Sequence, residues 1–262
     1  MGQTVAQIKQ MLAEADAEQL AALERTLAAD ERKGVVSALA AARKRVAAQA
    51  AEEERLAGMY RFQQELAAER GGSVVLGLDE VGRGPLAGPL AIGGVVLPAE
   101  PLIAGLNDSK KVAPKDREAI AAQVKEHAVA WTIQYIQPEE IDSAGMTACL
   151  RKAFVQAIAD IESQGVVPDV VLLDGNPLHL DPREVNVIKG DGKCAAIAAA
   201  SIVAKVDRDA LMCQLAQEYP QYGFDGNKGY GSAAHMDAIR EFGLSPVHRR
   251  SFCTSITQPT LF

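Results

Sequence analysis

The sequence from Ser73 to Leu97, SVVLGLDEVGRGPLAGPLAIGGVVL, decides the plan of the larger part of the chain. Its two ends, 73–79 and 90–97, are rich in Val, Ile and Leu and therefore predict two buried strands. The segment 80–89 between them is too short for the helix that joins two parallel strands, and its glycines and prolines are typical of a turn. The sequence therefore predicts an antiparallel hairpin here.

Strands and helices alternate after this hairpin. Further strands are expected at 129–136, 169–174 and 184–188, and helical patterns occupy 114–127, 138–163, 194–218 and 232–242. Pro114 and Pro138 stand at the first turn of two of these helices, where the missing N–H has no helical partner to lose. The alanine-rich segment 195–201 is expected to be a closely packed helix face. The alternation predicts an α/β domain.

Residues 1–70 have a different character, because they contain no proline and follow a helical pattern almost throughout. Asp16 and Asp30 are the expected N-caps, and Gly34 and Gly58 are expected to break the helices. Apolar residues recur at helical spacing at Val5, Ile8, Leu12, Leu20, Leu23 and Leu27. The sequence therefore predicts an all-helical N-terminal extension.

The composition bounds the class of protein. Hydrophobic residues make up 48% of the chain and charged residues 23%, and no apolar run approaches the roughly 20 residues that a membrane span needs. The first residues lack the apolar stretch of a signal peptide, and the four cysteines are scattered without a C-x-x-C pair. We therefore expect a cytoplasmic protein with reduced thiols, in preference to a disulfide or zinc site. Because the sequence shows no evident dimer seam, we expect a monomer.

The formal net charge of −7, taken alone, argues against a nucleic-acid-binding protein. Basic residues nevertheless cluster at 109–111, 189–193 and 248–250. Because binding depends on local fields rather than on the total charge, the composition leaves the question of nucleic-acid partners open.

Carboxylates stand at or just after the ends of three predicted strands. Asp79 and Glu80 end the first strand, Asp174 ends the strand at 169–174, and Asp191 follows the last one. Carboxylates held close together raise one another's pKa, and an oxygen-preferring cation such as Mg²⁺ or Mn²⁺ removes that cost. Two such ions can activate a water and stabilise the leaving oxygen in a phosphodiester displacement.

Each of these acids also has a simpler interpretation. Acidic residues are common in turns, and Asp174 or Asp191 alone is more often a turn residue than a metal ligand. Successive strand side chains point to opposite faces, so Asp79 and Glu80 meet only if the strand twists or ends between them. The spacing alone therefore leaves both a shared metal site and separate turn residues open.

Six blocks of the sequence, in order and spacing, resemble bacterial ribonuclease HII. They are GLDEVGRGPLAGPLAIGGVVL, LNDSKKV, LLDGN, KGDGKCAAIAAASIVAKVDRDALM, YGFDGNKGYGSAAH and SPVHRRSF. The resemblance implies the ribonuclease H fold, a mixed five-stranded sheet with helices on both sides and a small C-terminal helical part. It implies a catalytic domain over 71–253. The helical extension 1–70 lies outside this match, and residues 254–262, which have no partner segment, are expected to form a flexible tail.

The same resemblance implies an activity. The family cuts the RNA strand of RNA–DNA hybrids and nicks duplex DNA 5′ to a single embedded ribonucleotide, leaving a 3′-hydroxyl and a 5′-phosphate. The family's metal-binding acids, which hold two Mn²⁺ or Mg²⁺ ions, correspond to Asp79, Glu80, Asp174 and Asp191. A relative preference for long hybrids, as in ribonuclease HIII, and a non-catalytic protein that binds nucleic acid or the sliding clamp are the alternatives.

Two further elements of the family are implied to contact substrate. Its glycine-arginine-glycine element corresponds to Gly82, Arg83 and Gly84, whose backbone could approach a sugar and pair with its 2′-hydroxyl. Its tyrosine in K-G-Y-G corresponds to Tyr230, which is expected to pack on the neighbouring deoxyribose. The sequence departs from the family at Asn227, where a histidine is common.

The remaining blocks imply side chains that hold the phosphate backbone: Asn107, Ser109, Lys110, Ser201, Lys205, His248, Arg249 and Ser251. Such contacts position a duplex without reading its sequence, and they explain how an acidic protein binds DNA. For any single Lys or Arg in this set, a solvated surface charge is an equal alternative.

The segment QPTLF, 258–262, resembles the pentapeptide by which bacterial replication and repair proteins bind the sliding clamp. Gln258, Leu261 and Phe262 are the candidate clamp contacts, and Pro259 departs from the usual leucine. An unstructured end without a partner is the alternative.

Overall fold

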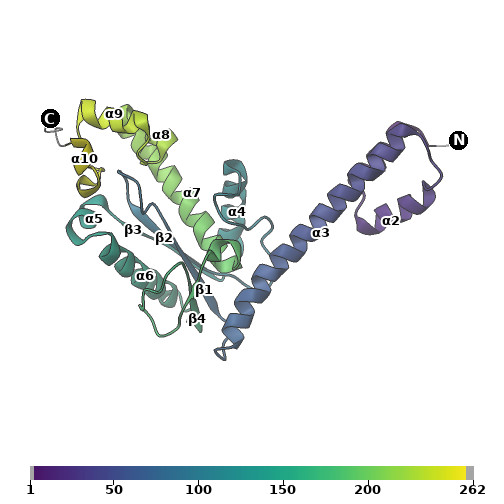
Figure 1. Cartoon of the computed structure of the whole chain (residues 1–262). Coiled ribbons are helices and arrows are strands. Elements are labelled where there is room, and N and C mark those ends of the chain that lie inside the picture. Colours follow the sequence, from purple (N-terminus) through teal and green to yellow (C-terminus); the bar gives the residue numbers. More distant parts are fainter. Residues whose placement is uncertain (1–2, 258–262) are drawn as a thin grey trace. The chain divides into compact units, whose positions relative to one another are not determined.

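The computed structural model describes residues 3–257, and the chain divides into two compact units, Met1–Ala57 and Gly58–Phe262 (Figure 1). The division falls inside one helix, α3 (Lys33–Ala68), rather than at the change of composition after residue 70. Within the described residues, no helix is long and apolar enough to cross a membrane.

The smaller unit consists of α1 (Val5–Glu14), α2 (Ala17–Thr26) and the first part of α3. Thr4 and Asp16 cap α1 and α2 in reciprocal hydrogen bonds with the glutamine three residues later, so the N-cap predicted at Asp16 is confirmed. The predicted helical spacing provides the core of this unit, which includes Ile8, Leu12, Leu20, Leu27 and Leu39.

Three helix boundaries that we expected in this region are wrong. Asp30 accepts a hydrogen bond from the backbone N–H of Arg32, at 3.1 Å, but α3 begins only at Lys33. Gly34 and Gly58 lie inside α3, because the cost of about 1 kcal/mol for a glycine is outweighed by the helix formers around it. A Cβ at Gly34 would lie 2.8 Å from Cγ1 of Val5, so the glycine permits close helix packing.

Five strands form one mixed sheet in the larger unit, in the order β3-β2-β1-β4-β5. The strands β1 and β2, and β2 and β3, pair antiparallel, whereas β4 lies parallel to both β1 and β5. Their bounds are β1 (Val75–Val81), β2 (Leu90–Val96), β3 (Ala130–Ile136), β4 (Val170–Asp174) and β5 (Glu184–Val187). The predicted hairpin and all five predicted strands are confirmed.

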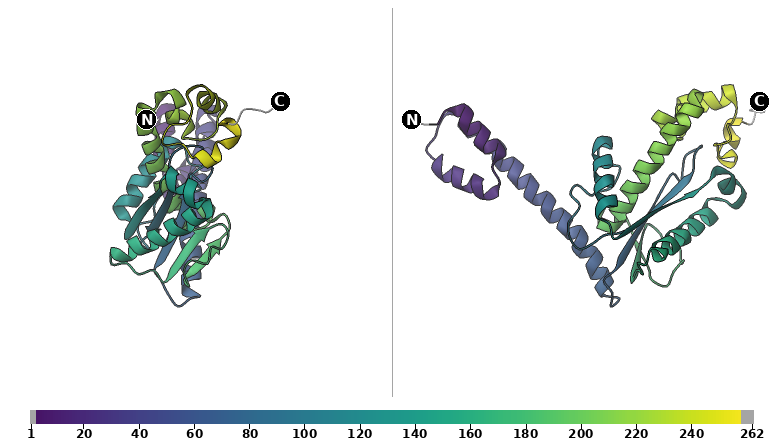
Figure 2. Two further views of the ribbon diagram at one scale, coloured as in Figure 1. Left: turned by 90° about the vertical axis from the view of Figure 1, so that its left-hand side faces the viewer. Right: turned by 180° about the vertical axis from the view of Figure 1, so that it is seen from behind.

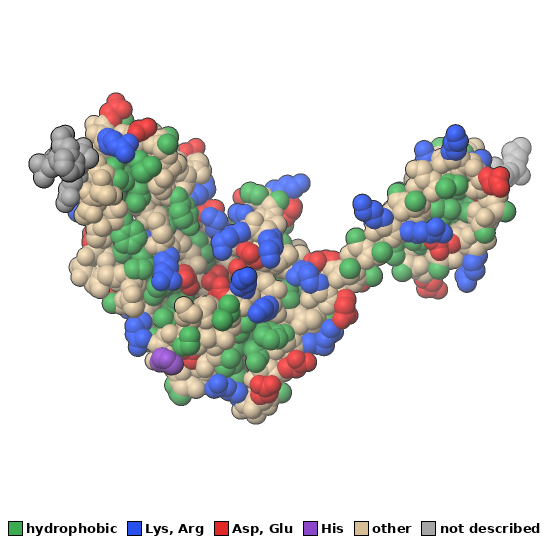
Figure 3. Space-filling model, viewed as in Figure 1, with side chains coloured by type: hydrophobic (Ala, Val, Ile, Leu, Met, Phe, Trp, Pro, Cys, Tyr) green, Lys and Arg blue, Asp and Glu red, His purple; other side chains and the backbone are tan. Residues whose placement is uncertain are grey.

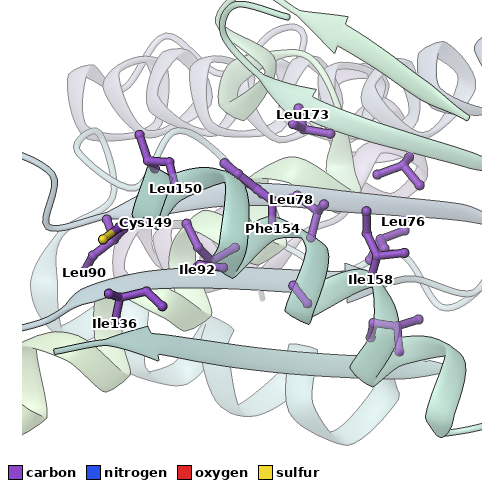
Figure 4. Close-up of a cluster of buried hydrophobic side chains, with 14 of the residues drawn as sticks. Leu76, Leu78, Leu90, Ile92, Ile136, Cys149, Leu150, Phe154, Ile158 and Leu173 are labelled. Atoms are coloured by element: carbon purple, nitrogen blue, oxygen red, sulfur yellow. The ribbon is translucent and has the colours of Figure 1, made fainter. Parts of the chain in front are cut away.

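Helices cover both faces of this sheet, as Figures 1 and 2 show. On one face, α6 packs over a cluster that includes Leu76, Leu78, Ile92 and Phe154 (Figure 4). On the other face lie α7 and α4. The bounds are α4 (Pro114–His127), α5 (Pro138–Ala144), α6 (Met146–Ser163), α7 (Ala195–Glu218) and α9 (Ala233–Phe242).

The single helix expected at 138–163 is two helices. Gly145, with a φ of 81°, separates α5 from α6 in a backbone conformation that only glycine adopts at little cost. The other predicted helices of the larger unit are present within one residue of the expected bounds.

Two strand glycines let α7 lie unusually close to the sheet. A Cβ at Gly77 would lie 2.2 Å from the carbonyl carbon of Ala196, and one at Gly93 would lie 2.2 Å from the carbonyl oxygen of Ala200. The segment 195–201 is buried along its whole length, which confirms the predicted packed helix face. This close approach brings the α7 side chains Ser201 and Lys205 to the end of β1.

The end of α3 belongs to the larger unit and supports α7. Oε1 of Gln63, a buried side chain, accepts a hydrogen bond from the N–H of Ala196 at 2.9 Å. The hydroxyl of Tyr60 accepts one from the N–H of Ile103 at 3.1 Å. Gln63 therefore satisfies a free N–H at the start of α7.

A small helical part follows α7, around a core of Met212, Tyr222, Phe224, Ile239 and Cys253. Thr254–Thr257 form the short helix α10, because Ile256 packs on this core, so the flexible tail expected from 254 does not begin there. The elements of this small helical part, besides α9, are η2 (Pro220–Tyr222), α8 (Phe224–Asn227), η3 (Arg250–Phe252) and α10. All four cysteines are free.

Candidate active site

The register of the sheet brings two of the predicted acids side by side. Strands β1 and β4 are parallel and pair Leu78 with Leu173. The residues that follow, Asp79 and Asp174, therefore lie on neighbouring strands at the same end of the sheet. Glu80 comes next on β1, and its side chain faces the same cleft as Asp79.

The fourth acid reaches this end of the sheet from the loop after β5. Asp191 lies in η1 (Gly190–Gly192), and the N–H of Gly190 donates a hydrogen bond of 2.7 Å to Oδ1 of Asp174. The charge of Asp174 helps to raise the pKa of Asp191, as expected for two neighbouring carboxylates.

A cleft of about 570 Å³ opens at this end of the sheet, lined by the ends of β1 and β4, one face of α7 and the loops around them. Figure 3 shows acidic and basic side chains side by side on this face of the larger unit. The cleft is lined by Asp79, Glu80, Val81, Gly82, Arg83, Gly84, Ser109, Lys110, Arg117, Asp174, Ser201, Lys205 and Tyr230. All of these except Val81 and Arg117 are residues singled out from the sequence, and Asp191 is the one predicted acid outside this lining.

The protein disfavours the ionised form of the Asp79 carboxyl. Its side chain is almost fully buried, and this burial raises its pKa well above the usual range. Glu80 and Asp174 raise the pKa further. Hydrogen bonds from the Ser201 hydroxyl and from the N–H of Glu80, at 2.8 Å, lower it only in part.

The pKa values of Glu80 and Asp191 are raised as well. Burial raises the pKa of Glu80, and Arg83, whose Nη1 lies 3.6 Å from Oε1, opposes that rise. Burial also raises the pKa of Asp191, with Asp108 and Asp174 adding to it and Lys110 opposing it. Burial is thus the first cause of each rise, and nearby cations and hydrogen bonds offset it only in part.

The residues present fit a hard divalent cation. Carboxylate oxygens are the ligands that such a cation prefers, and no His or Cys lines the cleft to favour a softer metal. Within residues 3–257, no three His, Cys, Asp or Glu side chains already stand in an arrangement that could hold a metal ion. The burial of the Asp79 carboxyl beside Glu80 and Asp174, rather than a ready-made coordination shell, is the observation that indicates a cation.

The glycine-arginine-glycine segment forms one wall of the cleft. Gly82 has a φ of 88°, and a Cβ there would lie 2.2 Å from Nε of Arg208, so no other residue fits. Gly84 has open space around it, which leaves its backbone accessible. The Arg83 side chain is mostly exposed to solvent.

Tyr230 reaches the cleft from the loop between α8 and α9. Tyr230 is 44% exposed. A tyrosine that served only to pack a core would be more deeply buried. Oδ1 of Asn227 accepts a hydrogen bond of 2.7 Å from the N–H of Gly229, so the residue that departs from the family pattern braces this loop.

A family model for ribonuclease HII matches residues 76–255, and one for the ribonuclease HII N-terminal domain matches residues 4–67. The chain belongs to the ribonuclease HII family. It is accordingly a ribonuclease H, a hydrolase that acts on RNA–DNA substrates. The predicted ribonuclease H-like fold is confirmed.

Solved structures agree with this assignment. The ribonuclease H2 of Pyrococcus horikoshii OT3 is 27% identical, with a TM-score of 0.59 over 70% of this chain and 96% of that chain. Ribonuclease HII of Archaeoglobus fulgidus, solved in a PCNA complex, is 23% identical, with a TM-score of 0.61 over 71% and 98%. Bst-RNase HIII in complex with Mn²⁺ is 19% identical, with a TM-score of 0.54 over 72% and 70%. The last two likenesses show the shared fold.

In this ribonuclease HII, Arg249 does not have the role expected of it. We expected a phosphate contact, but its side chain is completely buried, and its guanidinium donates hydrogen bonds to the carbonyls of Gly82, Arg83, Pro85 and Gly88. A guanidinium whose donors are bound to backbone cannot also bind a phosphate. Arg249 therefore holds the glycine-arginine-glycine segment in place.

Three other predicted phosphate contacts lie outside the cleft. The Ser251 hydroxyl donates a hydrogen bond of 2.5 Å to Asp142, and His248 is buried among aromatic rings. Asn107 lines a separate hollow beside α4. Gln258, Leu261 and Phe262 lie outside the described residues.

Sequence reasoning missed Asp108, Arg117 and Arg208. Asp108 lies within LNDSKK and is near enough to Asp191 to raise its pKa, and Arg117 projects into the cleft from α4. Arg208, also within a family block, is fully buried and holds the carbonyls of Ala87, Pro89 and Lys228. Their position in or near the blocks was the available signal, but nothing in the sequence distinguished buried from exposed arginines.

Proposed function

We propose that this ribonuclease HII nicks duplex DNA 5′ to single embedded ribonucleotides and also cuts the RNA strand of RNA–DNA hybrids. The products are a 3′-hydroxyl and a 5′-phosphate, and the role is the removal of ribonucleotides from DNA. The observation that carries the proposal is that one cleft unites Asp79, Glu80 and Asp174 with Gly82–Gly84 and the exposed Tyr230.

Asp79, Glu80, Asp174 and Asp191 are the residues that would hold two Mn²⁺ or Mg²⁺ ions. When bound, the ions supply an activated water and neutralise charge on the leaving 3′-oxygen. The raised pKa values of Asp79, Glu80 and Asp191 support this assignment, because added positive charge would relieve the cause of each rise. The Mn²⁺ complex of Bst-RNase HIII makes Mn²⁺ the first ion to test.

Other residues of the cleft orient the substrate. The open backbone at Gly84 lets a sugar approach closely, where amide and carbonyl groups distinguish a 2′-hydroxyl from a hydrogen. The exposed ring of Tyr230 offers an apolar face to the neighbouring deoxyribose. Together they favour a ribose followed by a deoxyribose, which is the junction at a single ribonucleotide.

Phosphate contacts come from both sides of the cleft. Lys110 and Arg117 approach from the α4 side, and Lys205 approaches from α7. The hydroxyls of Ser201 and Ser109 hydrogen-bond to each other at 3.0 Å beside Asp79. These positive charges would fix the duplex backbone without reading its sequence.

Replacing Asp79 with Asn tests the catalytic assignment. The variant keeps the size of the side chain but loses a charge that the metal ions need, so cleavage should fall by about 1,000-fold or more. Duplex binding, measured by fluorescence anisotropy, should stay within about 3-fold of the original chain, because the phosphate contacts remain. The control Asp237→Asn changes an acid that is 73% exposed on α9 and should cleave normally. Normal turnover by Asp79→Asn would count against the site.

The substrate assignment has its own test. With Mn²⁺ present, the original chain should nick a labelled duplex carrying one ribonucleotide and leave a 3′-hydroxyl at the cut. Incision of long hybrids only would indicate ribonuclease HIII-like specificity, and no incision with any metal would indicate a non-catalytic binding protein.

We also propose that the terminal segment QPTLF binds the DNA sliding clamp. The A. fulgidus ribonuclease HII, solved as a complex with PCNA, supports a clamp partner for the family. Changing Leu261 and Phe262 together to Ala should weaken clamp binding by at least about 10-fold, measured by surface plasmon resonance. Unchanged affinity would show that this segment has no part in clamp binding.

A further inference from the structure

Hydrogen bonds join the loop between β1 and β2, which contains Gly82–Gly84, to the loop between α8 and α9, which contains Tyr230. The N–H groups of Leu86 and Ala87 donate to the carbonyl of Gly229, at 2.8 and 3.3 Å. The buried Arg208 bridges the same segments, because its Nε donates to the carbonyl of Pro89 at 2.9 Å and its Nη1 to that of Lys228 at 3.1 Å. Backbone on both sides of the cleft is therefore held at a fixed separation.

A pair of buried histidines extends this network to Tyr230 itself. Nε2 of His235 lies 3.0 Å from Nε2 of His248, and Nδ1 of His235 lies 2.8 Å from the carbonyl oxygen of Tyr230. At the other end, the N–H of Ser245 donates to Nδ1 of His248 at 3.0 Å. The rings of Tyr222 and Phe224 pack around both imidazoles.

These contacts allow only one arrangement of protons in the neutral pair. Because Nδ1 of His248 accepts from Ser245, its proton lies on Nε2 and is donated to Nε2 of His235. His235 must then carry its own proton on Nδ1 and donate it to the carbonyl of Tyr230. Burial lowers the pKa of His235 and lowers that of His248 to about 4, so both rings are neutral at physiological pH.

We infer that His235 and His248 are positioning residues, which hold Tyr230 at the distance from Gly82–Gly84 that an RNA–DNA junction requires. The inference rests on the proposed function. A junction demands one contact to a 2′-hydroxyl and one to the next deoxyribose at the same time, so it depends on that distance. A continuous hybrid offers a 2′-hydroxyl at every sugar of the RNA strand and depends on it less.

Two substitutions at His235 separate this role from a general loss of packing. Asparagine places an N–H near the position of Nδ1 and can still donate to the Tyr230 carbonyl, whereas leucine cannot. Both variants leave Nε2 of His248 without its partner, so their difference reports the contact to Tyr230 alone.

The measurement is kcat/KM with Mn²⁺ on a one-ribonucleotide duplex, divided by kcat/KM on a long RNA–DNA hybrid. His235→Leu should lower this ratio by about 10-fold, which corresponds to the loss of one buried hydrogen bond, while hybrid cleavage stays within about 3-fold. His235→Asn should keep the ratio within about 2-fold of the original chain.

An unchanged ratio in His235→Leu, or an equal fall in both variants, would overturn the inference. An original chain that cuts neither substrate would instead overturn the proposed function, so the two failures are distinguishable. If His235→Leu does not unfold cooperatively on heating, Arg208→Lys serves in its place. Lysine keeps the charge but cannot span both loops, so the same fall in the ratio is expected. An unchanged ratio would overturn the premise that the distance between the loops sets the ratio, and with it the inference.

Discussion

Two regions of this ribonuclease HII, the floor of the cleft and the support of its glycine-arginine-glycine wall, treat buried charge in opposite ways. At the end of β1, Asp79 is buried beside Glu80 and Asp174, and the pKa of its carboxyl is raised. Arg249 is far from Asp79 in the sequence and is also buried, but its donors reach the carbonyls of Gly82, Arg83, Pro85 and Gly88. The hydrogen bonds to the Asp79 carboxyl only partly offset the effect of its burial, whereas the Arg249 guanidinium donates four hydrogen bonds to backbone carbonyls.

This difference distinguishes a residue that can bind a ligand, Asp79, from one that supports the structure, Arg249. Burial lowers the pKa of Arg249 only to about 10, so the guanidinium stays charged at neutral pH and keeps its hydrogen bonds. An acid whose ionised form is disfavoured binds a cation to relieve that cost, whereas a satisfied arginine has nothing further to bind. Buried ionisable groups whose charged form is disfavoured are therefore the better guide to where a ligand binds.

The largest expected change in stability comes from removing the hydrogen bonds of Arg249. Arg249→Met should lower the free energy of unfolding by about 3–5 kcal/mol, because the carbonyls it binds would be left without donors. Urea denaturation measures this change. Arg250→Met alters the exposed neighbouring arginine and should cost less than about 0.5 kcal/mol. A loss below about 1 kcal/mol in Arg249→Met would mean that Arg249 does not hold this wall.

A smaller change in stability, of opposite sign, is expected when the Asp79 carboxyl is removed. A carboxyl with a raised folded-state pKa stabilises the fold below its unfolded pKa, near 3.9, and loses that contribution as the pH rises through the folded-state value. Asp79→Asn cannot ionise and avoids the loss. With a chelator present, the variant should be more stable than the original chain by on the order of 1 kcal/mol at pH 8.

At pH 4, where Asp79 is protonated in the original protein, the stability of Asp79→Asn should approach that of the original chain. Thermal unfolding at both pH values checks this. Equal stability at pH 8 would show that Asp79 already has its charge balanced by the protein, and the contrast with Arg249 would disappear.

The smallest expected effect concerns Arg83, which lies between the two regions. Its side chain is 64% exposed and its ion pair with Glu80 spans 3.6 Å, so Arg83→Ala should change the free energy of unfolding by less than about 0.5 kcal/mol. A larger loss, measured by urea denaturation, would mean that this arginine also supports the wall of the cleft.

The strands and the acids at their ends could be predicted because both depend on local sequence. Runs such as SVVLGLD have one favourable environment, a buried strand, and the short turn after Asp79 permits only a hairpin. The family blocks indicated which acids belong together. The parallel pairing of β1 with β4 then brings Asp79 and Asp174 side by side.

The roles of the buried polar residues could not be predicted in this way. Arg249 and Lys110 are both cations within family blocks, yet one faces backbone carbonyls and the other lines the cleft. Gln63 looked like part of a separate extension, but it bonds to the first turn of α7. Each of these outcomes depends on a segment far away in the sequence.

The sequence by itself determined the strands, most of the helices and the identity of the acids, because hydrophobic periodicity and turn chemistry act over a few neighbouring residues. Only the tertiary structure decided which charges are satisfied. A guanidinium or carboxyl is satisfied by whichever groups the fold brings within hydrogen-bond distance, and in this chain those groups come from distant segments. Arg249 reaches back to the loop after β1, whereas Asp79 meets another acid.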